Sequence, residues 1–64
     1  MAKLNMNDKV KITCYNQTKE MTRGEALKFY KEAERCCEGS ERERYMNIVD
    51  QLEDGYMECN DLDF

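Results

Sequence analysis

The four cysteines are the side chains of this chain that could bind a metal ion, act as nucleophiles or form disulfides. Cys14, Cys36, Cys37 and Cys59 are spaced 22, 1 and 22 positions apart. Zinc sites built from cysteine use ligands about two to four residues apart, and reactive thiol pairs use a C-x-x-C spacing. Neighbouring residues on a helix point about 100° apart, so Cys36 and Cys37 do not form a ligand pair. The spacing therefore predicts no metal site and no cofactor.

Catalysis by the familiar side-chain groupings has no support in the sequence. The chain contains no histidine, which removes the Ser/His and Cys/His pairs that activate a nucleophile. Cys36 and Cys37 fall near the predicted C-terminus of a helix, where the helix dipole disfavours a thiolate. The three glycines are isolated and form no Gly-rich phosphate-binding loop. We predict a protein that is not an enzyme and that works by binding.

Carboxylates gather in the second half of the chain. Residues 1–35 carry a net charge of +3 and residues 36–64 a net charge of −7, which together give −4. A row of negative side chains can occupy a basic groove on another protein in the place of nucleic acid. A few exposed aromatic or other large apolar side chains usually supply most of the binding energy. The predicted partner-binding residues are Glu43, Asp50, Asp54, Glu58, Asp61, Tyr15, Met46 and Tyr56.

A basic surface in the first half of the chain offers an alternative function, the binding of DNA or RNA. Lys28, Lys31 and Arg35 follow one side of a predicted helix, and Lys9 and Lys11 follow one side of a predicted strand. Phosphate binding needs several uncancelled cations, so the net negative charge argues against direct contact with nucleic acid. The opposite charges of the two halves also allow a third hypothesis, self-assembly into a homo-oligomer.

The first part of the chain predicts two short strands that carry some of these candidate residues. Residues 9–15 alternate between polar and β-branched or apolar types, which predicts a half-buried strand. Residues 16–18 predict a turn, and residues 19–21 are a candidate for a short return strand. The residues of the first strand that face the core in this prediction are Val10, Ile12 and Cys14.

Thr22 and Glu25 form a capping-box pattern that predicts the start of a helix. This helix is expected to run to about Glu38. Its apolar residues recur at the spacing of one helix face. They are Ala26, Phe29, Tyr30, Ala33, Cys36 and Cys37.

The next helix is predicted over about residues 41–54. Gly39 supplies a left-handed end for the first helix, while Ser40 and Glu43 form a second capping box. Gly55 ends this helix. Its predicted buried residues are Tyr45, Ile48, Val49 and Leu52.

The predicted fold class is α+β. A small antiparallel sheet of two or three strands is covered on one face by an αα-hairpin, in the order β(β)ααβ. Residues 56–59 supply the last strand beside the first, which leaves a Cys14–Cys59 disulfide open. The 64 residues form one domain. Residues 1–7 and 61–64 are expected to be loosely ordered.

The compartment follows from what the sequence does not contain. No apolar stretch approaches the length that spans a bilayer, and the first residues lack the apolar core of a signal peptide. We therefore expect a cytoplasmic protein with free thiols and no membrane contact.

Two runs of the chain resemble segments of known proteins. The chain is similar to short hypothetical proteins of phages and mobile elements of gut Firmicutes in residues 37–45 (CEGSERERY), followed by Asn47-Ile48 and Gly55, and in residues 21–23 (MTR) leading into Glu25-Ala26. The resemblance extends over roughly residues 8–60, and those proteins have no established activity that would assign site residues. Small acidic proteins of such elements often inhibit host defence, and anti-CRISPR proteins are among them. The resemblance implies an inhibitor or accessory factor in the host bacterial cytosol, with a CRISPR effector or another nucleic-acid-binding complex as its protein partner.

Overall fold

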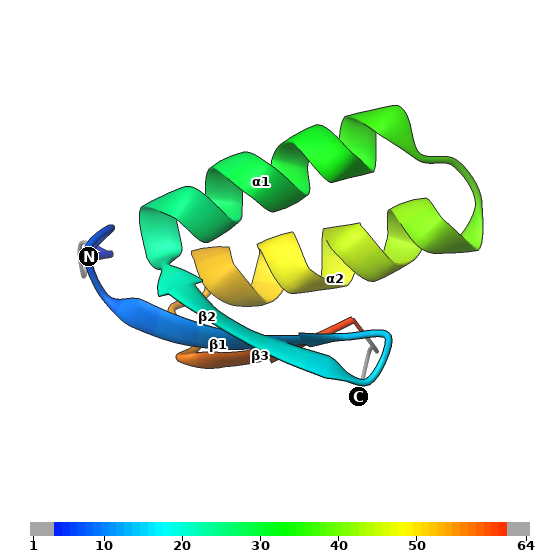
Figure 1. The fold of residues 1–64 in the computed structure, drawn as a ribbon. Helices are drawn as coiled ribbons and strands as arrows, with labels where there is room; N and C mark the ends of the chain where they lie inside the picture. Colours follow the sequence, from blue (N-terminus) through cyan, green and yellow to red (C-terminus); the bar gives the residue numbers. More distant parts are fainter. Residues whose placement is uncertain (1–3, 62–64) are drawn as a thin grey trace.

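The computed structural model describes residues 4–61, and they form a three-stranded sheet with two helices on one face (Figure 1). The elements in chain order are β1 (Lys9–Cys14), β2 (Gln17–Thr22), α1 (Arg23–Cys36), α2 (Ser40–Glu53) and β3 (Glu58–Asn60). The strands lie in the order β2-β1-β3. The predicted α+β class, with an αα-hairpin over a small sheet, is confirmed. No helix in the described part of the chain combines the length and the apolar character needed to cross a bilayer.

The hairpin of β1 and β2 is longer than the sequence indicated. The return strand covers Gln17–Thr22 rather than residues 19–21, with Ile12 opposite Lys19 and Val10 opposite Met21. Tyr15 and Asn16 make the turn with φ values of 52° and 64°. Positive φ at both turn residues suits the twist of a two-residue hairpin, and asparagine adopts it readily. Tyr15 therefore lies in the turn and not in the strand predicted for residues 9–15.

The third strand pairs with β1 in parallel, whereas the sequence predicted an antiparallel sheet. The direction follows from the helices between the strands. The chain leaves β2 at the end of the sheet where β1 begins, and the two antiparallel helices bring it back to that end (Figure 1). A strand that starts there has to run in the same direction as β1.

The segment ahead of β1 is bonded to the first turn of α1. Thr22 caps α1 as predicted, with its hydroxyl oxygen 3.3 Å from the Glu25 amide nitrogen. The Gly24 amide donates to the Met6 carbonyl oxygen at 2.9 Å, and the Arg23 amide donates to that of Asp8 at 2.8 Å. Residues 6–8 are thus held by defined contacts, unlike the loose order expected for residues 1–7. Residues 1–3 and 62–64 lie outside the described residues.

The junction between the helices differs from the predicted second capping box. Cys37 is the C-cap of α1, and Gly39, at φ 69°, is the N-cap of α2. Ser40 is already the first helical residue, and within residues 4–61 no side chain bonds the N-terminal amides of α2. The prediction that Ser40 caps this helix was wrong, because Gly39 takes the non-helical backbone conformation of the cap.

Gly55 ends α2 as predicted, through a Schellman motif. The Tyr56 amide donates to the Gln51 carbonyl oxygen at 3.1 Å, and the Gly55 amide donates to that of Leu52 at 3.2 Å. Gly55 has a φ of 94°, a region where glycine carries no Cβ penalty. The turn directs the chain from α2 into β3.

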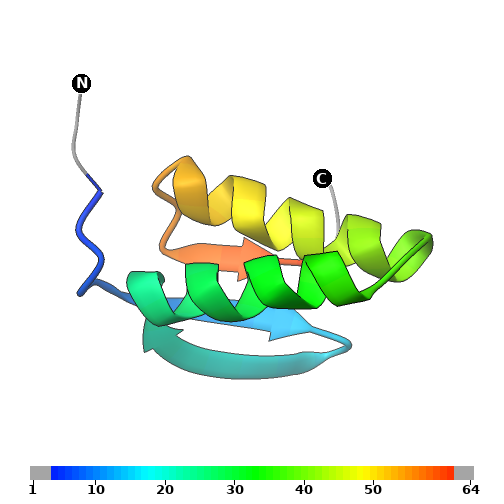
Figure 2. The ribbon, with the colours of Figure 1, turned by 90° about the horizontal axis from the view of Figure 1, so that it is seen from above.

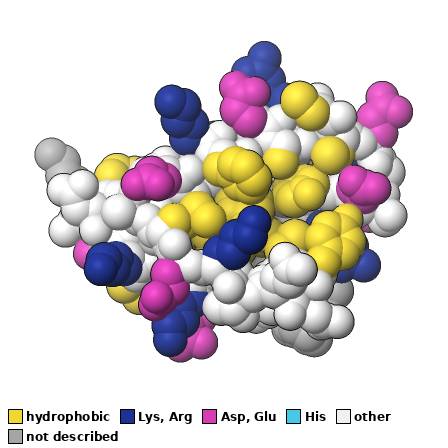
Figure 3. All heavy atoms as spheres, in the orientation of Figure 1, with side chains coloured by type: hydrophobic (Ala, Val, Ile, Leu, Met, Phe, Trp, Pro, Cys, Tyr) yellow, Lys and Arg dark blue, Asp and Glu magenta, His cyan; other side chains and the backbone are white. Residues whose placement is uncertain are grey.

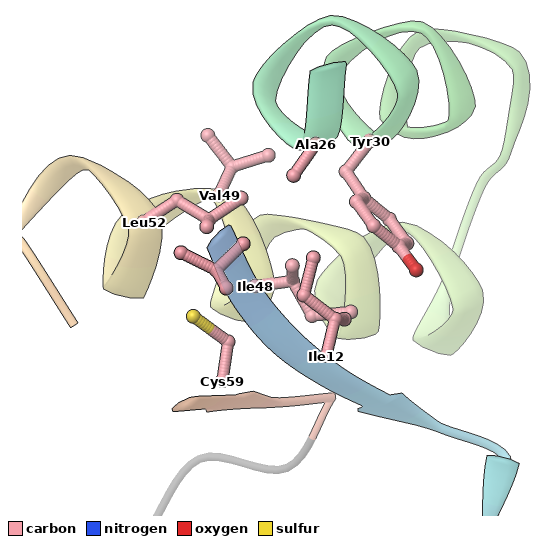
Figure 4. Packing of buried hydrophobic residues seen from close by; sticks show 8 residues of the cluster. Ile12, Ala26, Tyr30, Ile48, Val49, Leu52 and Cys59 are labelled. Atoms are coloured by element: carbon pink, nitrogen blue, oxygen red, sulfur yellow. The ribbon is translucent and has the colours of Figure 1, made fainter. Parts of the chain in front are cut away.

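The core lies between the helices and the strands β1 and β3 (Figure 4). Its buried residues are Val10, Ile12, Ala26, Tyr30, Ile48, Val49, Leu52 and Cys59. Cys14 and Ala33, which the sequence placed in the core, are only half-buried, and Phe29 is 53% exposed. Seen from above, β2 extends past the edge of α1 (Figure 2), so no second layer formed by residues 4–61 covers this side of α1.

Candidate functional site

The outward side of α2 carries most of the predicted acidic residues. Glu43, Asp50 and Asp54 are exposed and recur at helical spacing, and none has an ion-pair partner among residues 4–61. Glu43, Met46, Asn47 and Asp50 line one shallow hollow of about 270 Å³. Met46 is 39% exposed. We refer to Glu43, Met46, Asn47, Asp50 and Asp54 as the acidic α2 face.

Three further predicted partner-binding residues lie outside this face. Tyr15 sits in the β1–β2 turn beside Arg44, whose guanidinium carbon is 4.9 Å from its ring centroid. Tyr56 follows the C-terminus of α2 and is about half exposed. The helix of 14 residues separates the two tyrosines by roughly 20 Å at 1.5 Å per residue. Glu58 lies on β3 opposite Lys11, on the outer face of the sheet.

Asp61 is part of the fold and not of the acidic surface. It is 5% exposed, and its carboxylate accepts hydrogen bonds from Arg44 Nη1 at 2.7 Å and from the Tyr15 amide at 3.2 Å. Burial by itself would raise the pKa of Asp61, but these hydrogen bonds outweigh it and hold the pKa below its ordinary value. The burial of Asp61 therefore does not support its predicted role as a partner contact. Tertiary contacts also override the loose order expected for it as part of residues 61–64.

The predicted basic residues are divided between two surfaces and lie among carboxylates. On α1, Lys31 pairs with Glu53 at 3.2 Å, Arg35 lies 4.0 Å from Glu32, and Lys28 borders a hollow that Glu25 and Glu32 also line. On the outer sheet face, Lys11 stands opposite both Glu20 and Glu58, and Lys9 stands opposite Thr22. The structure does not bring these cations together into one uncancelled patch.

The sequence interpretation missed Arg23, which is 2% exposed. Its guanidinium donates to the carbonyl oxygens of Leu52 at 2.7 Å, Tyr56 at 3.1 Å and Gly55 at 3.3 Å. Arg23 thus caps the C-terminus of α2 with a cation, which is favourable there. One signal was available, because Arg23 precedes Ala26 and Tyr30 at the spacing of the buried side of α1.

A second surface feature is an aromatic groove beside β2, which the sequence did not indicate. It has a volume of about 190 Å³ and is lined by Tyr15, Phe29, Tyr30, Tyr45, Gln17, Lys19 and Cys14. Phe29 and Tyr30 meet edge to face at 4.9 Å, and burial raises the pKa of Tyr30 to about 12. Figure 3 shows hydrophobic side chains gathered on one face of the molecule with a basic side chain among them.

The thiols are free and do not converge. Cys59 is buried opposite Ile12, and Cys14 lies two residues further along β1, so the register does not place the two thiols across from one another. Cys36 is exposed and Cys37 half-buried, so neither is the core cysteine that the sequence suggested. Burial raises the pKa of Cys59 and of Cys14, which keeps both protonated and weakly nucleophilic at neutral pH.

Comparison of the chain with protein-family models, with curated proteins and with solved structures found no match. The surfaces described above are therefore the basis for assigning a function.

Proposed function

We propose that this protein is a small non-enzymatic inhibitor or accessory factor of a phage or mobile element. Its acidic α2 face binds a basic surface on a host defence or nucleic-acid-handling complex, such as a CRISPR effector, and blocks that surface by occupying it. The observation that supports this proposal most directly is the row formed by Glu43, Asp50 and Asp54, which has no ion-pair partner among residues 4–61.

A nucleic-acid-binding target would account for the negative charge of the acidic α2 face. Surfaces that hold nucleic acid carry lysine and arginine side chains directed at phosphates. A helix of 14 residues is about 21 Å long, and Glu43 and Asp50, seven residues apart, lie on one side of it, with Asp54 at its C-cap. Such a row speeds the encounter with a basic groove and fixes the orientation of docking.

Met46 is the expected apolar anchor of the interface. It lies in the hollow lined by Glu43 and Asp50, so a partner that covers the carboxylates also covers the methionine. Methionine is flexible and adapts to irregular surfaces, and it is enriched at interface cores. Tyr15 and Tyr56, near opposite ends of α2, would contact the rim of a large partner surface.

Direct binding of nucleic acid by the basic residues has weaker support. Lys31 and Arg35 already lie beside carboxylates, and Lys11 stands between two of them. Contacts with phosphate would have to compete with these neighbours.

Affinity purification of the tagged protein from a Firmicute host, followed by binding assays with the purified captured protein, tests the proposal. The variant Asp50→Lys/Asp54→Lys is expected to lose binding by at least about tenfold, because it reverses the charge of the acidic α2 face. The matched control Glu20→Lys/Glu38→Lys changes the net charge by the same amount on other surfaces and should retain binding. The captured protein should bind nucleic acid, and the two ligands should compete.

Two results would refute the proposal. One is unchanged affinity in the Asp50/Asp54 variant for every captured protein. The other is a gel shift of DNA or RNA by the purified protein that weakens steeply with salt, which would support the basic surface instead.

A further inference from the structure

The two edges of the sheet differ in whether a side chain bonds their outward backbone groups. At the β3 edge, the side-chain amide of Gln51 donates to the Asn60 carbonyl oxygen at 3.1 Å and accepts from the Asn60 amide at 2.9 Å. Gln51 thus satisfies the outward backbone groups of Asn60, as a further strand would. Within residues 4–61, no side chain takes this role at the β2 edge.

The free backbone groups of β2 follow from the hydrogen bonds of β1. The Lys11 amide and the Thr13 carbonyl oxygen bond the segment of β3. Alternate residues of a strand bond opposite neighbours, so Val10, Ile12 and Cys14 bond β2. Their partners are Gln17, Lys19 and Met21. The N–H and C=O groups of Thr18 and Glu20 therefore point to the open edge.

The aromatic groove borders this same edge. Lys19 and Gln17 face it from β2, and Phe29, which is 53% exposed, faces it from α1. Lys19 is the one charged side chain among the described groove residues, and it has no ion-pair partner within residues 4–61. An open strand edge, an exposed ring and an uncompensated ammonium group thus lie side by side.

We propose that the β2 edge and the aromatic groove together bind one extended segment of a partner protein. The segment adds a fourth strand through the backbone of Thr18 and Glu20. On its groove side it carries a carboxylate opposite Lys19 and an aromatic residue two positions away that packs on Phe29. This surface is separate from the acidic α2 face and goes beyond the function proposed above.

A second copy of the chain is a poorer occupant than an acidic partner strand. A two-fold pairing of β2 with itself that uses most of the strand is centred on Lys19 or Glu20. The first pairing sets two ammonium groups opposite one another, and the second sets two carboxylates opposite. Like charges directly opposite across strands are destabilising. A strand that carries a carboxylate opposite Lys19 has no such conflict.

The synthetic peptide Thr-Phe-Thr-Glu-Thr-Phe-Thr is a suitable probe. Its two phenylalanines and its glutamate alternate with threonines, so in a strand all three face the groove. In a titration of isotope-labelled protein followed by NMR, we expect shift changes in Gln17–Thr22 and Phe29. The amides of Thr18 and Glu20 should gain protection from hydrogen exchange, and those of β3 should not. A peptide with lysine in place of glutamate, and one N-methylated along its backbone, should each bind at least about tenfold more weakly.

Three variants locate the binding on the protein. Phe29→Ala and Lys19→Glu should each weaken the probe about tenfold, and Thr18→Pro should abolish binding by removing an edge N–H donor. Circular dichroism establishes that each variant is folded, and Asp50→Lys/Asp54→Lys should bind the probe normally. Absence of binding at about 1 mM peptide, or shifts confined to α2, overturns the proposal. A dimer that Thr18→Pro dissociates in light scattering also overturns it, in favour of a second copy.

Discussion

Arg23 and Asp61 are both buried charged side chains, and they lie beside opposite ends of α2. Arg23 gathers carbonyl oxygens at the C-terminus of the helix, where Asp8, its ion-pair partner among residues 4–61, is 4.0 Å away and partly exposed. Asp61 instead has a direct ionic partner, Arg44, and an amide donor in the β1–β2 turn. Each charge fixes the helix to a segment distant in sequence. The first does so mainly through backbone groups, and the second through a charge pair.

The largest expected effect is at the Arg23 end. Arg23→Met should lower the free energy of unfolding by about 3 kcal/mol, because it removes the buried, charged donor shared by the carbonyl oxygens of Leu52, Gly55 and Tyr56. Urea unfolding followed by circular dichroism measures this loss. Asp8→Asn is the matched control and should cost under about 1 kcal/mol, since Asp8 is distant and partly exposed. Equal losses in the two variants would mean that the ion pair, and not the carbonyl groups, holds Arg23.

The next effect is at the Asp61 end. Asp61→Asn should lower the free energy of unfolding by about 2 kcal/mol, because the amide keeps an acceptor for Tyr15 but gives up the charged bond to Arg44. The same urea titration measures it. A loss larger than that of Arg23→Met would reverse the proposed order of the two ends.

The two ends should also differ in their response to pH. The pKa of Asp61 is lowered in the folded state, so the stability it contributes is present above the ordinary carboxyl value near 4. That stability is lost as the pH falls below this value towards the folded pKa. The difference between the urea midpoints of the wild type and Asp61→Asn should therefore be smaller at about pH 3 than at about pH 7. The Arg23→Met variant should stay below the wild type at both values, since arginine remains charged throughout. An equal difference between the wild type and Asp61→Asn at the two pH values would contradict a lowered pKa of Asp61 as the source of this stability.

The smallest effect is expected at the exposed pair between the two helices. Lys31→Met removes the 3.2 Å contact with Glu53, and both side chains are about half exposed. Exposed ion pairs contribute little, so the free energy of unfolding should change by less than about 0.5 kcal/mol. A loss comparable to that of Asp61→Asn would show that burial does not explain the ranking of these charges.

The sequence by itself determined the local features of this protein. The alternation in residues 9–14, the Thr22 cap and Gly55 at the end of α2 each depend on neighbours within a few positions. These signals were sufficient to predict the α+β class, the helical hairpin and most of the core. They also predicted the carboxylates of α2 that share one face, because helical spacing alone sets their directions.

Tertiary structure decided which charges are buried and which edge of the sheet is open. Asp61 belonged to an acidic run in the sequence, and only the approach of Arg44 and Tyr15 removed it from the surface. Gln51 blocks the β3 edge because the parallel third strand lies beneath α2, a direction that the sequence did not predict. Burial depends on segments that meet across the fold, and no local pattern records which segments those are.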